Sequence, residues 1–381
     1  MQHHKIAVID FGGQYAHLIA TKVRRLHVLA EIRQPEDPVQ AFEDYRGIVF
    51  SGSPALASQG DEGGYDPRIF DLDVPILGLC FGHQEIARHY GGRIEHTQRE
   101  YGPARMEVTE GNALFATWPN EQTVWMSHGD SVTELPSGFL ELGVSVAPDG
   151  TRHRNAAIAN VALKRYGLQF HPEVDDTEFG EEMLANFVLR VCGCDPTWTM
   201  GRYVEEQRAV IQAEVGERSV FLLVSGGVDS TVCARLIGEA VGPERLQLLH
   251  IDNGLMRKDE SREVVHEFQR LGLGSRLHFV DASERFLAAL DGVIEPESKR
   301  RIIGETFVRV FEDEAARLKL GDVLLAQGTI YPDTIETGGT KRADVIKTHH
   351  NRVALIEELI AQGRVIEPIK ELYKVEVREL G

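Results

Sequence analysis

The chain has 381 residues, more than one hydrophobic core usually holds, so two domains are expected. Its formal net charge is −18, from 41 Lys+Arg against 59 Asp+Glu, which disfavours nucleic acid and anionic membranes as partners. Four cysteines in a chain of this length do not indicate a disulfide framework. No segment reaches the roughly 20 apolar residues that span a bilayer, and no signal core follows Met1, so a cytoplasmic protein is expected.

The first part of the chain alternates short apolar runs with a helical pattern. Residues 6–10, 47–51 and 75–79 read as buried strands, and the spacing of apolar residues around Leu18 predicts a helix with one buried face. Alternation of this kind is typical of a parallel sheet covered by helices.

From about residue 93 to 170 the segments become shorter and more alternating, which predicts an antiparallel flank. Residues 157–169 read as two strands around 164–167. A helix over 177–191 then ends at Gly193 and Pro196. We therefore place the domain boundary at Pro196, giving domains 1–196 and 197–381.

The second half repeats the same alternation. A helix is expected over 204–215, a strand over 220–224, a helix from Thr231 and a strand over 246–251, whereas 334–342 reads as a mobile loop. The predicted fold class is α/β, with two doubly wound domains. Each is a mainly parallel sheet flanked by helices, and the first carries the antiparallel flank.

The segment Gly78-Leu79-Cys80-Phe81-Gly82 joins a predicted strand to a predicted helix. A turn of small residues at such a junction projects its middle side chain outward, as a nucleophile requires. The helix N-terminus would stabilise a thiolate, and backbone N–H groups at the turn could hold an oxyanion. A cysteine on its own is more often inert packing.

A nucleophilic thiol needs a base, and the base needs an orienting group. His171 and Glu173 stand two residues apart and therefore on the same side of an extended segment. Cys80, His171 and Glu173 together form a plausible catalytic triad.

These residues carry a resemblance. Gly78 to Gln84, together with His171-Pro172-Glu173, resembles the signature of class I glutamine amidotransferases. The resemblance implies oxyanion contacts at Ser53 and Phe81, with Ser53 in place of the family's usual second glycine. It also implies that Gln84, His128 and Asp130 bind glutamine, although an ordinary polar loop is the alternative reading.

A second chemical signal is Ser225-Gly226-Gly227-Val228-Asp229-Ser230-Thr231, which follows a strand and opens a helix. Glycines, hydroxyl groups and a helix N-terminus together form a phosphate cradle. No Gly-Lys-Ser/Thr follows, so it is not a Walker A loop. It resembles the loop of enzymes that cut ATP between its α and β phosphates.

Such an enzyme transfers AMP to an oxygen of its acceptor, and Mg²⁺ would offset the charge of the departing pyrophosphate. Asp229 is the candidate metal contact. Asp252, at the end of a strand, is expected to contact ATP at the carboxyl edge of the sheet, with a plain strand-to-helix turn as the alternative.

The stretches 299–304, 326–333 and 346–351 resemble GMP synthetases and cover nearly the whole second domain. The resemblance implies that ammonia from glutamine replaces the AMP-activated C2 oxygen of xanthosine monophosphate (XMP), giving GMP for purine biosynthesis. It implies that Arg300 contacts the XMP phosphate. It also implies that residues 331–347 form a lid with Asp333, Glu336, Lys347 and His349 facing the reaction.

Members of that family continue beyond residues 373–381 into a dimerisation domain, which this chain lacks. The resemblance implies a homodimer for the longer protein, and a chain that hydrolyses glutamine and binds ATP but makes little GMP by itself. Two alternatives remain: a relative of the asparagine or NAD synthetases, which combine similar ATP loops with other glutaminases, and a regulatory binding module with an inactive glutaminase.

Overall fold

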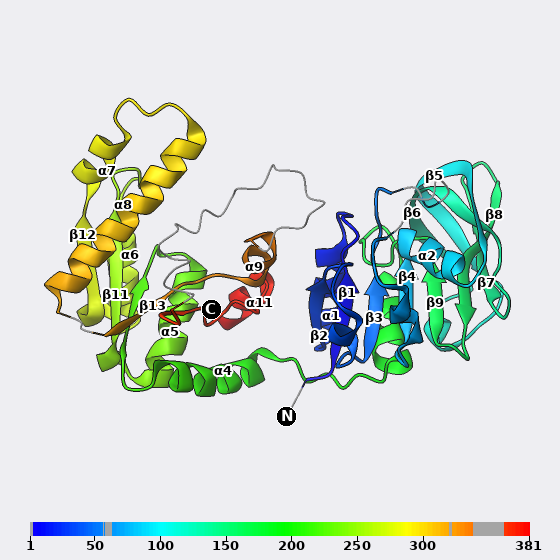
Figure 1. The fold of residues 1–381 in the computed structure, drawn as a ribbon, viewed down its shortest axis with the longest axis horizontal. Coiled ribbons are helices and arrows are strands. Elements are labelled where there is room, and N and C mark those ends of the chain that lie inside the picture. The colour runs from blue at the N-terminus through cyan, green and yellow to red at the C-terminus, as the bar shows by residue number, and fades with distance from the viewer. Residues whose placement is uncertain (1–2, 56, 58–62, 320–321, 338–361) are drawn as a thin grey trace. The chain divides into compact units, whose positions relative to one another are not determined.

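The computed structural model describes residues 3–55, 57, 63–319, 322–337 and 362–381 (Figure 1). The chain divides into two compact units, Met1–Thr199 and Met200–Gly381. The division therefore follows closely on Pro196, where the sequence places the boundary.

The first unit contains a nine-stranded sheet in the order β2-β1-β3-β4-β9-β8-β7-β5-β6. Its first five strands are parallel and short, and three of them, with the sequences KIAVI, GIVF and ILGL, are buried almost throughout. Near-continuous aliphatic runs are what a strand covered on both faces requires. The parallel strands are β1 (Lys5–Ile9), β2 (Leu29–Arg33), β3 (Gly47–Phe50), β4 (Ile76–Leu79) and β9 (Arg165–Leu168).

The antiparallel flank consists of longer strands. These are β5 (Arg93–Val108), β6 (Glu121–Glu134), β7 (Leu140–Val146) and β8 (Arg152–Asn160), joined to the parallel half through β8 and β9. The sequence places the turn between two strands at 164–167. That position is wrong, because β9 already starts at Arg165. The turn lies at 161–164, where the Asn160 side chain accepts a hydrogen bond from Leu163 N and Lys164 adopts a positive φ of 56°.

Helices cover the sheet of the first unit. α1 (Ala16–Arg25) packs beside β1, β2 and α3 (Gly180–Ala185), and α2 (Phe81–His89) packs over β3, β4 and β9. A π-helical segment, Asn186–Val191, continues α3, so the helix expected over 177–191 is present but changes its winding. Short 3₁₀ helices occupy Val39–Phe42, Pro67–Asp71 and Ala113–Phe115.

The second unit is built on a five-stranded sheet, all parallel, in the order β12-β11-β10-β13-β14. Its strands are β10 (Ser219–Leu223), β11 (Leu246–Asp252), β12 (Leu277–Asp281), β13 (Val323–Ala326) and β14 (Val365–Ile366). β11 and β13 lie on opposite sides of β10, so the strand order reverses there. In sheets of this kind, ligands bind at the carboxyl ends of the strands where the order reverses.

Seven helices are described in this unit (Figure 1): α4 (Met200–Val215), α5 (Val228–Val241), α6 (Glu260–Arg270), α7 (Ser283–Leu290), α8 (Pro296–Arg317), α9 (Tyr331–Thr337) and α11 (Lys374–Leu380). Phe286 of α7 and Val310 of α8 share a core with Phe221 and Leu249 of the sheet. α5 packs on β10 and β11 and also contacts α4 and α11. Short 3₁₀ helices occupy Pro243–Arg245 and Gly274–Arg276.

Both units thus combine a sheet with flanking helices, which confirms the α/β class. Two local expectations need correction. The helix expected from Thr231 begins at Val228, and residues 331–337, partly expected as loop, form α9. Among the residues that the structure describes, no helix is both long and apolar enough to cross a membrane.

Candidate active site

The carboxyl ends of four parallel strands of the first unit converge on one cavity. Residues that follow these strands line it: Gly12 after β1, Ser53 after β3, Cys80 after β4 and His171 after β9. The cavity has a volume of about 490 Å³, which suits a small polar molecule such as an amino acid. Parallel topology therefore gathers side chains that lie far apart in the sequence.

The turn at Cys80 has the strained backbone of a nucleophile elbow. Cys80 adopts φ 53° and ψ −104° and is the N-cap residue of α2. Close contacts around this turn explain why positions 78 and 82 are glycines. A side chain at Gly78 would collide with the backbone of Gly82, and one at Gly82 would collide with the backbone of Phe50. Only glycine at both positions lets α2 leave β4 so sharply.

His171 is held by Glu173 through a hydrogen bond of 2.7 Å between Nδ1 and Oε1, with both side chains buried. Burial acts to lower the pKa of His171, but the negative charge of Glu173 and hydrogen bonds to Cys80 and Glu173 outweigh it. The pKa of His171 is therefore raised well above its usual value.

Gly52, in the segment after β3, lies next to both His171 and Cys80. A Cβ atom at this position would lie 3.2 Å from His171 Cε1 and 3.8 Å from Cys80 Cβ. A side chain larger than that of glycine would therefore press on His171.

The other three cysteines have the environment of packed thiols. Burial raises the pKa of Cys192 and of Cys233, and raises the pKa of Cys194 to about 11. A thiol that stays protonated at neutral pH is a poor nucleophile. Of the four cysteines, only Cys80 lines this cavity.

The two expected oxyanion contacts, Ser53 and Phe81, both line the cavity that contains Cys80. Ser53 has no positive φ, so its backbone does not require glycine. Its hydroxyl donates to Phe11 O at 3.0 Å and accepts from Ala55 N at 3.1 Å, which shapes the loop. Phe81 is the first residue of α2, and an N–H group there has no acceptor within its own helix.

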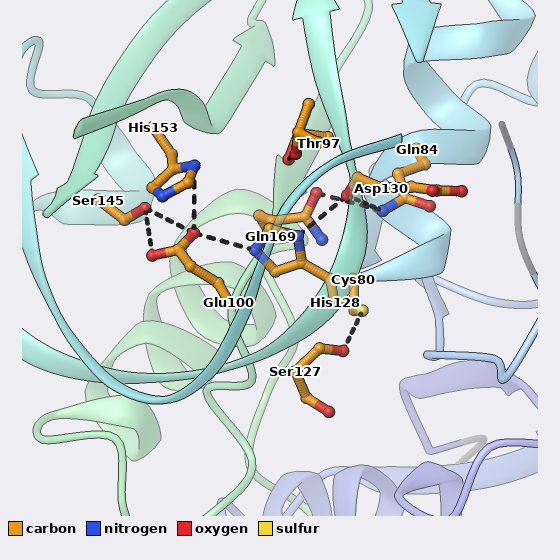
Figure 2. Close-up of polar contacts among 11 residues, drawn as sticks. Cys80, Gln84, Thr97, Glu100, Ser127, His128, Asp130, Ser145, His153 and Gln169 are labelled. Atoms are coloured by element: carbon orange, nitrogen blue, oxygen red, sulfur yellow. Dashed lines mark hydrogen bonds and ion pairs between the residues drawn. The ribbon is translucent and has the colours of Figure 1, made fainter. Parts of the chain in front are cut away.

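The residues expected to bind glutamine all line the cavity, and Figure 2 shows their polar contacts. Gln84 Nε2 donates to Asp130 O at 2.9 Å and to Gln169 Oε1 at 3.3 Å. Cys80 Sγ lies 3.6 Å from Ser127 O, its hydrogen-bond acceptor. The structure thus brings Gln84, His128 and Asp130 together in the cavity that Cys80 lines.

Sequence reasoning missed two aromatic residues of this cavity. Tyr15, which precedes α1, places its ring 5.0 Å from the ring of His171 in an edge-to-face contact. Tyr101 of β5 also lines the cavity and is 67% exposed. The position of Tyr15 after the first parallel strand could have signalled it, because loops at that edge carry sites. No local pattern marks Tyr101.

In the second unit, the predicted phosphate loop lies at the carboxyl edge where the strand order reverses. Gly226 has φ 80°, and a side chain there would collide with Val264. The hydroxyl groups of Ser230 and Thr231 donate to Gly227 O at 3.0 and 3.1 Å, and Ser225 Oγ accepts from Gly227 N at 3.3 Å. These bonds fold the loop onto the N-terminus of α5, which favours an anion.

Asp229 has two differently placed carboxylate oxygens. Oδ2 accepts a hydrogen bond of 2.5 Å from Lys374 Nζ, whereas Oδ1 is buried and has no hydrogen-bond partner among the described residues. Lys374, the first residue of α11, thus reaches the loop from 145 positions away. Sequence reasoning missed this residue, because nothing near it in the chain marks a phosphate site.

The remaining predicted residues of this unit lie in different settings. Asp252 ends β11 and accepts hydrogen bonds from Gly254 N and Ser261 Oγ. Arg300, in the first turn of α8, is paired with Glu297. Asp333 accepts from Ile330 N at the start of α9, and Glu336 belongs to the same helix. Lys347 and His349 lie outside the described residues.

Comparisons with known proteins agree with this geometry. The family described as glutamine amidotransferase class-I matches residues 7–191, the stretch that contains the cavity and its triad. The fold, the site and this match define the first unit as a domain of the class-I glutamine amidotransferase type. The matched residues lie in the unit that carries Cys80, His171 and Glu173.

Curated relatives match the whole chain. The GMP synthase (glutamine-hydrolyzing) of Heliobacterium modesticaldum is 46% identical over all of this chain and 72% of its own length. That of Aquifex aeolicus is 45% identical over all of this chain and 73% of its own length. A Leptospira interrogans protein named "Probable GMP synthase" is 45% identical, and this chain spans 62% of its length. The chain belongs to the glutamine-hydrolysing GMP synthase family.

Proposed function

We propose that the first unit hydrolyses glutamine to glutamate and ammonia. Cys80 Sγ attacks the side-chain carboxamide carbon, and backbone N–H groups of Ser53 and Phe81 stabilise the oxyanion. His171 donates a proton as the C–N bond breaks, so ammonia leaves and a thioester remains. Water, deprotonated by His171, then releases glutamate and regenerates the thiol. Glu173 keeps the imidazole oriented throughout, as its 2.7 Å hydrogen bond to Nδ1 supports.

We further propose that the second unit activates XMP with ATP. The residues 225–231 bind the phosphates, and Asp252 contacts the nucleoside. The XMP C2 oxygen attacks the α-phosphorus and pyrophosphate leaves. Ammonia then adds at C2 and displaces AMP, giving GMP. The support is the cradle at the carboxyl edge of the all-parallel sheet, and the family of the whole chain.

Mg²⁺ fits this site at Asp229. The buried, unpartnered Oδ1 is a hard oxygen ligand in the loop that would hold the phosphates, and Mg²⁺ in such sites takes one or two carboxylates plus phosphate oxygens. When bound, the ion would offset negative charge on the pyrophosphate. Lys374 supplies a second positive charge at the same carboxylate.

The roles of Arg300 as a phosphate contact for XMP, and of Asp333, Glu336, Lys347 and His349 as lid residues, belong to this proposal. So do the homodimer and the cytoplasmic location. The observation that carries the proposed function is the joint presence of the elbow triad and the phosphate loop in one chain.

An acceptor screen tests the identity of the substrate. The chain, and a form extended beyond Gly381 by the dimerisation domain expected from the resemblance, would be given ATP, Mg²⁺ and candidate acceptors. AMP and pyrophosphate are expected to form with XMP. Formation with aspartate or deamido-NAD instead would favour a relative of the asparagine or NAD synthetases.

A further inference from the structure

A buried polar cluster lies beside the glutamine cavity, with one member from each strand of the antiparallel flank (Figure 2). Its members are Glu100 of β5, His128 of β6, Ser145 of β7 and His153 of β8. Glu100 stands opposite His128 in the strand register, directly after the irregularity between His96 and Glu100. Glu100 and His128 are each 5% exposed, and the proposed mechanism uses no side chain of Glu100, Ser145 or His153.

A carboxylate buried this deeply is costly unless its oxygens are satisfied. Ser145 Oγ donates to Glu100, 3.1 Å from either oxygen, and His128 Nε2 lies 3.1 Å from Oε2. His153 Nδ1 is 3.9 Å from the same oxygen. Glu100 is thus the acceptor at the centre of the cluster.

The hydrogen bonds of His128 determine how many protons the side chains of His128 and Glu100 share as a pair. Its Nδ1 lies 3.0 Å from the carbonyl oxygen of Asp130, which can only accept, so Nδ1 carries a proton. The bond between Nε2 and Glu100 then requires a second proton, on His128 or on Glu100. In either arrangement the buried pair holds two protons and has a formal charge of zero.

The hydrogen bonds continue from Glu100 and His128 to residues that line the cavity. The carbonyl oxygen of Asp130 that accepts from His128 also accepts from Gln84 Nε2. Ser127, on the same segment, supplies the carbonyl oxygen that faces Cys80 Sγ. Tyr101, which follows Glu100 and therefore points to the other face of β5, lines the cavity as well.

We propose that Glu100 is a positioning residue for the glutamine site: through His128 it fixes the segment 127–130 and Gln84, and so sets the affinity for glutamine. The inference rests on the glutaminase function proposed for the first unit. Glu100 touches neither the sulfur nor the substrate, and it acts through the backbone that lines the pocket.

Other titratable groups face this pair. His83 of α2 is fully buried, and burial, with the charge of His128 as a second cause, lowers its pKa to about 3, so it stays neutral at working pH. His96 lies 3.0 Å from Asp130 Oδ1 and is about half exposed.

The test uses two substitutions of Glu100 and measures glutamate release at a series of glutamine concentrations. Glu100→Ala removes the acceptor and is expected to raise KM about 10-fold or more, with a smaller change in kcat because the triad is untouched. Glu100→Gln is expected to keep KM within about threefold of wild type at neutral pH. Its amide can donate to neutral His128 while its oxygen accepts from Ser145.

The comparison of KM with kcat in the two variants separates positioning from a purely structural role. Glu100→Ala should change mainly KM, and Glu100→Gln, which keeps the hydrogen bonds to His128 and Ser145, should restore KM. Glu107→Gln, on the same strand but in the ion pair with Arg152, is the matched control and should behave as wild type.

A KM in Glu100→Gln that is raised about 10-fold or more would overturn the proposal, as would an unchanged KM in folded Glu100→Ala. If Glu100→Ala does not fold, Glu100→Gln alone decides. If the chain releases no glutamate, the glutaminase proposal fails separately. Calorimetric titration of glutamine into Cys80→Ala, with and without Glu100→Ala or Glu100→Gln, then still measures the effect of Glu100 on binding.

Discussion

Both candidate sites lie at the carboxyl edge of a parallel sheet. They differ in how many of their polar contacts are already formed between protein groups. In the first unit, Cys80, His171 and Glu173 are all buried, and His171 is already hydrogen-bonded to Glu173. In the second unit, the phosphate loop is formed, but Asp229 is held by Lys374 and one of its oxygens has no partner among the described residues. A covalent mechanism requires preformed contacts between protein groups, whereas a phosphate site is completed by its ligand.

The largest of the expected effects short of removing a catalytic group concerns Lys374. Lys374→Met should weaken binding of Mg²⁺-ATP about 10- to 100-fold, because it removes a cation and leaves the Asp229 carboxylate to repel phosphate. Calorimetry on the 381-residue chain measures the change. Lys370→Met is the matched control, since Lys370 is exposed in the segment before α11. Equal affinities in the two variants would show that Lys374 pairs only with Asp229.

A smaller effect is expected from crowding the first site. Gly52→Ala places a methyl group 3.2 Å from His171 Cε1 and should lower kcat/KM for glutamine about 10-fold while the fold is kept. Gly111→Ala is the control, because a Cβ there meets nothing within 4 Å. Steady-state glutamate release reads out both. A Gly52→Ala enzyme with wild-type kcat/KM would mean that the site is less tightly assembled than the structure indicates.

The smallest expected effect is a dependence of stability on pH. His83 has a pKa lowered to about 3, so the unfolded chain binds its proton first as the pH falls below about 6.5, and stability decreases. Between pH 7 and pH 5 this should cost about 1–2 kcal/mol. His171 has the opposite sign: its raised pKa gives stability that is present below about pH 6.5 and is lost as pH rises through the folded value.

Urea unfolding of wild type and His83→Asn at several pH values measures this effect. The variant should show a flatter fall in stability between pH 7 and 5, whatever its stability at pH 7. Parallel slopes for the two proteins would mean that His83 does not carry the acid sensitivity of the first unit.

Local patterns in the sequence predict the parallel strands, the elbow at Cys80 and the loop at Ser225, because glycines and aliphatic runs act over a few residues. The turn at 161–164 was misplaced because Lys164, unmarked in the sequence, adopts a positive φ. Glu100 reaches His128 through the register of β5 and β6, and Lys374 reaches Asp229 through the packing of α11 beside α5. Contacts of this range depend on tertiary packing, which a single sequence does not display.

The helix from Val228 shows the same limit at short range. Its first turn contains Asp229 and Ser230, residues that are read as part of a loop, yet their positions next to Gly227 make them the N-terminus of α5. Capping residues favour helix starts, so the phosphate loop and the helix overlap. A boundary between them is therefore poorly defined by residue type alone.

Cys80 is the proposed nucleophile that releases ammonia from glutamine. The most direct test compares glutamate release from glutamine by wild type, Cys80→Ala and Cys192→Ala, each checked for folding. Loss of at least about 10³-fold in Cys80→Ala alone is predicted. Glutamate release that persists in Cys80→Ala, or that disappears equally in Cys192→Ala, would contradict the assignment.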